Sequence, residues 1–246
     1  MSRLYRIFLI CPLIFLGSTG PSSADPDALW RIVSSQCVLN IAPCAKVDSP
    51  GHYAILKDQR GIAQHLLIPT DKVTGIESSA LLDPATPNFF AAAWAEKGAT
   101  EARLPHPLPR DSVSLAVNAL NARSQNQLHI HIDCLSVEAR DALKAATAKV
   151  GHQWAPLADP VAGHHFIAIR VDGEDLGTFN PFIALAKTLT NPTVEMASRN
   201  LVVVGADFAE GPGFLVLSDV AQAKIFGIFG YAGGEDVQDH TCAIDK

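Results

Sequence analysis

The chain has 246 residues, of which 48% are hydrophobic, and this apolar content excludes an intrinsically disordered protein. The formal net charge is −6 and no long run of like charge is present, so nothing favours a nucleic acid as a partner. The acidic balance does not exclude an anionic substrate, because a basic pocket can form within an acidic protein.

The first 24 residues have the layout of a secretory signal peptide. Arg3 and Arg6 precede an apolar run over residues 7–16, and small and polar residues follow up to Ala24. This run is much shorter than the ~20 apolar residues that a membrane-spanning helix needs. The sequence therefore predicts export, with cleavage after Ala24. A retained leader that anchors the protein is the alternative.

The number of cysteines fits an exported protein. Removal of the leader takes away Cys11 and leaves four cysteines, an even number that suggests two disulfides. Of the three pairings that four cysteines allow, we predict Cys37 with Cys44 and Cys134 with Cys242. The alternative is one bridge and two buried thiols. A zinc site built from these cysteines is not expected, because no C-x-x-C pair exists.

Secondary structure follows from periodicity and turn residues. Alternation and β-branched or aromatic runs predict strands over residues 52–57, 64–68, 112–118, 128–135, 166–171, 201–204 and 213–217. Helical spacing and capping residues predict helices over residues 27–38, from Thr86 or Asn88 through Trp94, and over 137–150, 181–188 and 219–226. The first two strands form a hairpin. A proline-rich connector over residues 104–110 is too short to separate domains, so we predict one α+β domain over residues 25–246.

The strand over residues 128–135 carries the residues best suited to catalysis. His129, His131 and Asp133 point to one side of it, because side chains alternate along a strand. An imidazole is a good nucleophile toward phosphorus without a metal, and a second imidazole can manage the proton or bind a phosphate oxygen. The pattern suits nucleotidyl or phosphatidyl transfer. It suits equally well a zinc site with a third ligand from elsewhere, or two histidines on a solvated sheet face.

The surroundings of this strand resemble the histidine-triad superfamily. Gln127-Leu-His129-Ile-His131-Ile is similar to the superfamily motif His-φ-His-φ-His-φ-φ, with glutamine in the first histidine position. The stretches 55–58 and 64–69 resemble its nucleotide-binding hairpin. The resemblance implies a histidine-triad-like core over about residues 50–135, in which an antiparallel sheet has flanking helices and the later strands extend the sheet.

Further motifs narrow the resemblance to the bacterial CDP-diacylglycerol pyrophosphatases. Each motif is weak alone, but their shared order is specific and runs from the leader to the last cysteine. The motifs are Thr86-Pro-Asn-Phe-Phe90 with Trp94, Ser114-Leu-Ala116 with Asn118, Gln125-Asn126, Gly163-His164 and Asp239-His-Thr-Cys242.

This resemblance implies hydrolysis of CDP-diacylglycerol to CMP and phosphatidate by an enzyme of phospholipid metabolism that needs no cofactor and no metal. His129 is expected to be the nucleophile and His131 to stabilise the attacked phosphate, while an amide hydrogen bond from Gln127 supports the nucleophile. Substrate contacts are expected from Lys57, Asp58, His65, Asn118, Gln125, Gln127 and His164. Structural roles are the alternative for Lys57, Asp58, His65, Asn118 and His164, as turn, strand or loop residues.

The implied partners are a nucleotide-lipid and the membrane surface from which it is reached, and no nucleic acid. The implied location is the periplasm, with attachment to the inner membrane if the leader is retained. Two other functions stay open: a nucleotidyl hydrolase or transferase for soluble nucleotides, and a non-enzymatic exported protein that binds a metal or a lipid. The oligomeric state also stays open, because many superfamily members are dimers, yet the long segment after Val150 could replace a partner subunit.

Overall fold

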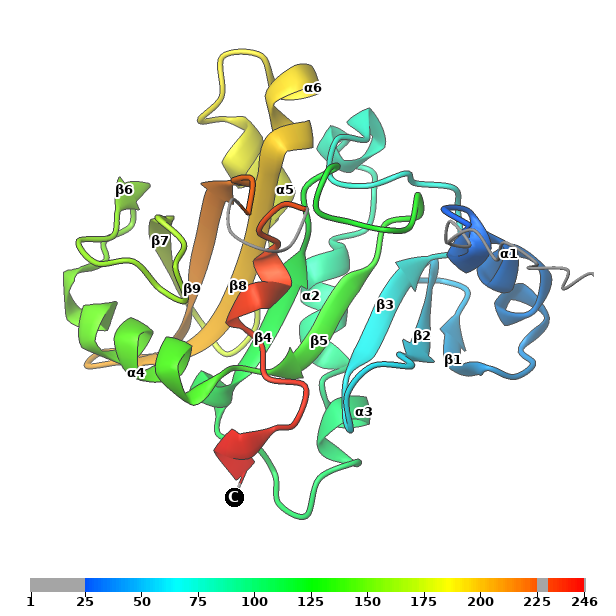
Figure 1. Cartoon of the computed structure of the whole chain (residues 1–246), viewed down its shortest axis with the longest axis horizontal. Helices are drawn as coiled ribbons and strands as arrows, with labels where there is room; N and C mark the ends of the chain where they lie inside the picture. Colours follow the sequence, from blue (N-terminus) through cyan, green and yellow to red (C-terminus); the bar gives the residue numbers. More distant parts are fainter. Residues whose placement is uncertain (1–24, 225–229, 246) are drawn as a thin grey trace, which may run out of the picture.

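The computed structural model describes residues 25–224 and 230–245. Within them, nine strands form one antiparallel sheet (Figure 1). The strand order is β1-β2-β3-β5-β4-β8-β9-β7-β6. The strands are β1 (Cys44–Asp48), β2 (Tyr53–Lys57), β3 (His65–Pro69), β4 (Val113–Val117), β5 (Ile130–Cys134), β6 (Ala155–Pro156), β7 (Ile167–Asp172), β8 (Arg199–Phe208) and β9 (Gly211–Val220). The predicted α+β class is confirmed. The predicted leader lies outside the described residues.

The predicted hairpin is present as β2 and β3, with Tyr53 opposite Pro69 and Lys57 opposite His65. Strand β5 pairs with β3 on one side and with β4 on the other, so the histidine strand lies between the hairpin and β4. The later strands β8, β9 and β7 continue the sheet beyond β4, as the sequence predicts, and the two-residue strand β6, which was not predicted, forms the edge. Strands β1 to β5 therefore form one half of the sheet and the later strands the other.

The helix predicted over residues 219–226 is wrong for the described residues. Asp219 and Val220 end strand β9, where they pair with Asn200 and Arg199 of β8, and residues 221–224 are not helical. The apolar spacing of this stretch favours a helix locally, but ten paired positions along the β8–β9 hairpin outweigh that local preference.

Helices cover both faces of the sheet. They are α1 (Ala28–Ser35), α2 (Phe89–Ala95), α3 (Gly98–Glu101), α4 (Val137–Ala146), α5 (Pro181–Ala186) and α6 (Pro192–Glu195). Side-chain caps start three of them: the Asn88 oxygen accepts from Ala91 in α2, Ser136 caps α4, and Asn180 caps α5. None of the described helices is long and apolar enough to cross a membrane.

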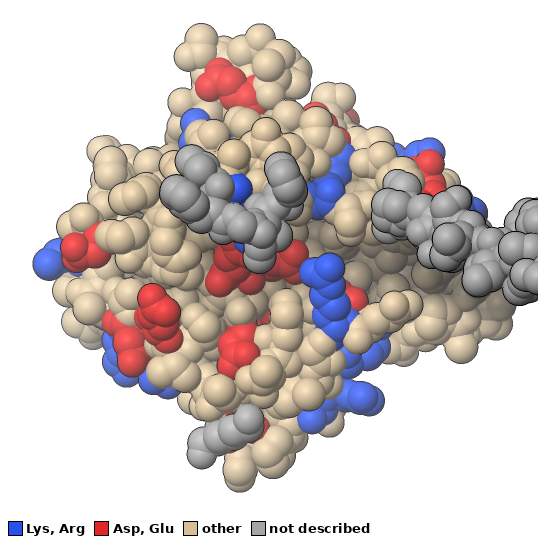
Figure 2. Space-filling view, viewed as in Figure 1, with Lys and Arg blue, Asp and Glu red and all other residues tan. Residues whose placement is uncertain are grey.

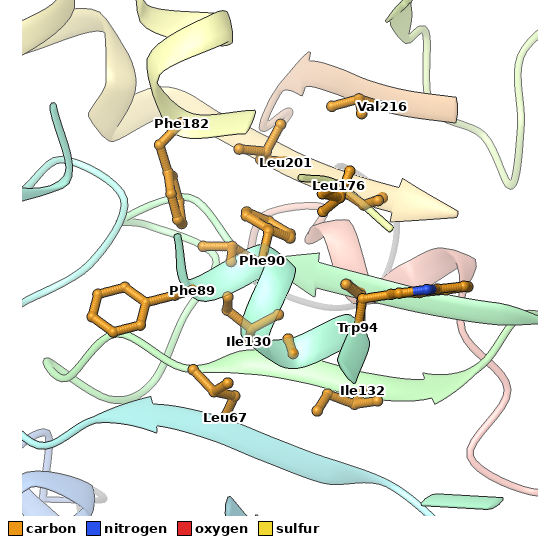
Figure 3. Close-up of a cluster of buried hydrophobic side chains, with 14 of the residues drawn as sticks. Leu67, Phe89, Phe90, Trp94, Ile130, Ile132, Leu176, Phe182, Leu201 and Val216 are labelled. Atoms are coloured by element: carbon orange, nitrogen blue, oxygen red, sulfur yellow. The ribbon is translucent and has the colours of Figure 1, made fainter. Parts of the chain in front are cut away.

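The largest core cluster lies on the α2 face of the sheet. Phe89, Phe90 and Trp94 of α2 are buried there with Ile130 and Ile132 of β5 (Figure 3). These aromatic side chains therefore lie on the opposite face of β5 from its histidines. They pack against the α2 face of the sheet and do not line the face on which the histidines lie.

The other face carries two separate core clusters with a gap between them. Leu29 and Val33 of α1 pack on the hairpin strands, and Leu143 of α4 packs on the β8–β9 half of the sheet. His131 lies between the two clusters, because its cross-strand neighbour Leu66 belongs to the α1 cluster and its other neighbour Ala116 belongs to the α4 cluster. In Figure 1, α1 and α4 lie on opposite sides of β3, β5 and β4, with the C-terminal segment in front.

Two disulfides join the same cysteines that the sequence suggests. Cys37 is bonded to Cys44 after α1, and Cys134 at the end of β5 is bonded to Cys242 near the C-terminus. The second bridge holds the C-terminal segment against the sheet, and so it holds that segment next to the histidine face of β5.

Candidate active site

A pocket with a cavity volume of about 570 Å³ opens in the gap between the α1 and α4 clusters. This size is typical of small-molecule sites, which span roughly 300–1,000 Å³. Its apolar wall comes from α1 and the hairpin. Its lining includes His129, His131, Lys57, Asp58, Arg60, Asn118, Arg123, Gln125, Tyr231 and Glu235. Five of these residues are charged, and Figure 2 shows basic and acidic atoms meeting in the middle of this face.

His129 has its lone pair at Nε2. Its Nδ1 lies 2.7 Å from the backbone carbonyl oxygen of Gln127. A carbonyl oxygen can only accept a hydrogen bond, so Nδ1 carries the proton and donates it. The other ring nitrogen is then unprotonated, which is the form an imidazole needs in order to attack phosphorus.

Gln127 supports His129 through its backbone, which corrects the predicted amide contact. The Gln127 side chain is fully buried, and its amide nitrogen donates to the carbonyl oxygens of Pro69 and Asp71. The amide therefore fixes the chain just before β5. The carbonyl two residues before the histidine performs the role that we expected of the side chain.

His131 is held in the opposite tautomer. The amide nitrogen of Gln64 lies 2.7 Å from His131 Nδ1, and because it donates, Nδ1 accepts and Nε2 carries the proton. Nε2 is buried and finds no hydrogen-bond partner among the described residues. His131 can therefore offer an N–H group to an oxygen that enters the pocket, while its neighbour offers a lone pair.

Both histidines are uncharged at neutral pH. Burial, together with the neighbouring His131, lowers the pKa of His129 to about 4. Burial likewise lowers the pKa of His131 to about 4. The two ring centroids are 4.9 Å apart, so a single phosphate group can contact both rings. The pair thus presents an unprotonated ring nitrogen next to a hydrogen-bond donor.

The turn between β2 and β3 forms one rim of the pocket. The Lys57 ammonium donates to the backbone carbonyls of Asp58 and Gly61, and the Asp58 carboxylate accepts from the Arg60 backbone. Lys57, Asp58 and Arg60 all line the pocket. Lys57 and Asp58 therefore shape the turn and also reach the site. No motif marked Arg60 as a site residue.

Asn118 and Glu235 form the facing rim. The Asn118 amide nitrogen donates to a Glu235 carboxylate oxygen at 3.1 Å, and its oxygen accepts from the Glu235 backbone at 3.2 Å. The other carboxylate oxygen lies 3.4 Å from His131 Nδ1. Glu235 was not predicted, because nothing in the local sequence indicates that the C-terminal turn at residues 234–237 crosses β4. A Cβ on Gly233 would lie 2.7 Å from the Asn118 oxygen, so this approach requires glycine.

Gln125 lines the pocket and also fixes the start of α1. Its amide oxygen accepts from the Leu29 backbone at 2.8 Å. In the same loop, Arg123 binds both carboxylate oxygens of Glu77 at 2.6 and 2.7 Å. Glu77 thus neutralises Arg123. Lys57 and Arg60 are the other cationic groups of the lining, and a guanidinium nitrogen of Arg60 lies 3.9 Å from a Glu235 carboxylate oxygen.

Two predicted contact residues do not reach the pocket. His65 lies opposite Ile132 and so points to the α2 face, where its Nδ1 donates to the Ala63 carbonyl at 2.8 Å and lies 3.3 Å from the Thr100 hydroxyl. His164 is buried between two aspartates, with nitrogen–oxygen distances of 2.8 Å to Asp219 and 3.5 Å to Asp236. Neither residue therefore belongs to the candidate site.

His164 is charged and has a structural role. Burial acts to lower its pKa, but hydrogen bonds to Asp219 and Asp236 outweigh burial and raise the pKa to about 9. Because Asp236 directly follows Glu235, this ion-pair network fixes the turn that carries the pocket carboxylate.

Asp133, the third side chain on the histidine face, is fully buried and bonded to His240 at 2.7 Å. We did not predict this pair, because His240 reads as a surface residue in the sequence. Among the described residues, Asp133 also belongs to one group of potential metal ligands, with Cys134 and Cys242. Those two cysteines are bonded to each other and offer no thiolate, so this group does not suit a metal.

Comparison with known proteins identifies the family. The family model described as CDP-diacylglycerol pyrophosphatase matches residues 24–246. A curated CDP-diacylglycerol pyrophosphatase from Yersinia pestis is 35% identical over 227 residues, which cover 90% of this chain and 86% of the relative. The chain therefore belongs to the CDP-diacylglycerol pyrophosphatase family.

Proposed function

We propose that the protein hydrolyses the phosphoanhydride of CDP-diacylglycerol to CMP and phosphatidate, with His129 as the nucleophile. Family membership supports the reaction and the substrate. The observation that carries the residue assignment is the pair of opposite tautomers: a lone pair on His129 next to an N–H group on His131, both in uncharged rings.

The reaction proceeds in two displacements. Nε2 of His129 attacks one phosphorus of the diphosphate, the bond from that phosphorus to the bridging oxygen breaks, and the bridging oxygen leaves with the electron pair as part of the first product. The phosphorylated ring is positively charged, because its proton stays on Nδ1, where it is donated to the Gln127 carbonyl oxygen. Nε2–H of His131 donates to an oxygen of the attacked phosphate. Lys57 and Arg60 offset the remaining negative charge.

Water completes the cycle. It attacks the same phosphorus, the phosphorus–nitrogen bond breaks, and its electron pair returns to Nε2 of His129. The water molecule must lose a proton, and Glu235 is our candidate base, because its buried carboxylate oxygen faces His131 and has no hydrogen-bond partner among the described residues.

Gln64 is a positioning residue for His131. We expect Gln64→Glu to place a carboxylate at Nδ1, draw the proton there and raise the pKa of His131. The wild-type kcat/KM should stay level as pH falls from 7 to about 5, because both rings titrate near pH 4. In the variant, kcat/KM at pH 7 should be about 10–100-fold lower, and its fall with acid should begin at a higher pH.

The pH profile separates this role from a structural one. Gln64→Met serves as the matched control, because it keeps the length of the side chain but adds no charge. It should lower kcat/KM without moving the pH at which activity falls. If Gln64→Glu and Gln64→Met have the same pH profile as wild type, Gln64 does not control the tautomer of His131.

The site suits a variant histidine triad, in which Gln127, His129 and His131 occupy the three motif positions. The β2–β3 hairpin and β5 support this assignment, because they provide the pocket rim and the histidine pair. The backbone carbonyl at the first position explains why glutamine can stand there. Lys57, Asp58, Asn118 and Gln125 are the proposed substrate contacts.

We place the enzyme in the periplasm. Residues 1–24 would form the leader that directs its export, and this leader is either cleaved or retained as an inner-membrane anchor. The two disulfides support an oxidising compartment. Residues 25–246 form the proposed single domain, which agrees with a family match over residues 24–246.

Product analysis tests the proposed function. Purified protein incubated with CDP-diacylglycerol should release CMP and phosphatidate in equal amounts, and EDTA should not reduce the rate. CDP-choline or another soluble CDP derivative should be cleaved more slowly. Faster cleavage of soluble nucleotides would contradict the lipid substrate, and loss of activity with EDTA would contradict a metal-free mechanism.

A further inference from the structure

The loop between α1 and β1 exposes three large aliphatic side chains within four residues. Val38 is 48% exposed, Leu39 67% and Ile41 50%. The loop sequence Val38-Leu-Asn-Ile-Ala-Pro43 contains no charged residue. Single exposed aliphatic residues are ordinary on protein surfaces, but a cluster of them needs an explanation.

The loop is a fixed structure and not a frayed connection. The Cys37–Cys44 disulfide closes it at its base. Inside it, the backbone nitrogens of Asn40 and Ile41 donate to the carbonyls of Cys37 and Gln36. The disulfide and these hydrogen bonds therefore keep the aliphatic side chains exposed to solvent.

The cluster lies beside the pocket. Pro43 of the loop lines the pocket together with Leu29 and Ile32 of α1. Nine large hydrophobic side chains are exposed among the described residues, and six are in this loop or within two chain positions of a pocket-lining residue. Those six are Val38, Leu39, Ile41, Ile62, Leu120 and Tyr231. Most of the exposed hydrophobic residues therefore belong to chain segments that contribute to the pocket wall.

We propose that the loop over residues 38–43 docks the enzyme on the lipid bilayer and that the substrate headgroup enters the pocket from that bilayer. This inference rests on the proposed function. The two acyl chains of CDP-diacylglycerol keep it in a membrane, so its diphosphate can reach His129 only if the pocket mouth comes to the membrane surface. Aliphatic side chains that enter the interface gain free energy in proportion to the area they bury there.

A bilayer fits the loop better than a protein partner does. Three aliphatic side chains cover far less than the roughly 1,200–2,000 Å² that a stable protein interface buries. A bilayer does not require a matching surface, and the uncharged loop meets no desolvation cost of buried charge there. Pro43 of the loop also lines the pocket that we propose to bind a lipid headgroup, and this position favours a bilayer as the partner.

The test compares one substrate in two physical states. The full chain carrying Val38→Ser, Leu39→Ser and Ile41→Ser is assayed on CDP-diacylglycerol in phosphatidylcholine vesicles and on a short-chain CDP-diacylglycerol kept below its micelle concentration. We expect kcat/KM on vesicles to fall roughly tenfold or more, with no change on the monomeric form. Val194→Ser is the matched control, because Val194 is 64% exposed on α6, away from the pocket.

The single variant Leu39→Ser provides a second measurement if the triple variant unfolds, since its side chain is the most exposed of the three. It should show a smaller loss on vesicles only. Equal losses on both substrate forms, or no loss on vesicles, overturn the docking proposal. A wild-type protein that cleaves neither form overturns the proposed function, and the docking proposal with it.

Discussion

His129→Ala should lower kcat by at least about 10⁴-fold, the loss typical of removing an enzymatic nucleophile. The reason is that no other described side chain in the pocket combines a neutral imidazole with an unprotonated Nε2. His131→Ala should cost less, about 10²–10³-fold, because it removes one hydrogen-bond donor to the developing charge and leaves the nucleophile in place. Steady-state release of CMP measures both losses.

His106→Ala provides the control for this pair of variants, because His106 is 73% exposed and does not line the pocket. It should retain full activity. The assignment of roles fails if His131→Ala is the more damaging variant, or if His129→Ala keeps more than a few per cent of wild-type turnover.

Loss of the Cys134–Cys242 bridge should have the largest effect on stability. The bridge spans 108 residues, and closure of a loop of this length restricts the unfolded chain enough to contribute about 5 kcal/mol. The Cys37–Cys44 bridge spans only 7 residues and should contribute about 2 kcal/mol. Urea unfolding of Cys134→Ala/Cys242→Ala and Cys37→Ala/Cys44→Ala under oxidising conditions measures both free energies.

The longer bridge should also affect the site. It fixes the segment that carries His240, and His240 bonds the buried Asp133 on the histidine face of β5. We therefore expect Cys134→Ala/Cys242→Ala to lose activity at temperatures where Cys37→Ala/Cys44→Ala is still active. Equal unfolding free energies for the two double variants would show that loop length does not determine the contribution of these bridges.

The local sequence predicts the framework of the site well, because alternation along β5 depends only on neighbouring residues. Leu128, Ile130 and Ile132 enter the core on the α2 face, while His129 and His131 line the pocket. The hairpin turn likewise places Lys57 and Asp58 at the pocket rim, as its residues suggest.

The partners of the histidines could not be predicted, because they depend on which strands become neighbours. Gln64 precedes His65 by one residue and points to the opposite face, so strand alternation, and not residue type, decides which of them meets His131. Glu235 reaches the site because the C-terminal turn crosses β4, a path fixed by the Cys134–Cys242 bridge and the ion pairs of His164. The contacts of His131 with Gln64 and Glu235 join residues more than 60 positions apart.

The most direct test of the account is to trap the covalent intermediate. Two preparations of CDP-diacylglycerol, each with ³²P in one of the two phosphates, are mixed with enzyme and quenched in alkali, where a phosphorus–nitrogen bond survives. We predict that one of the two labels attaches to the peptide that contains His129, that acid releases it, and that His129→Ala abolishes it while His106→Ala does not. A label on another residue, or full turnover with no label from either preparation, would contradict His129 as the nucleophile.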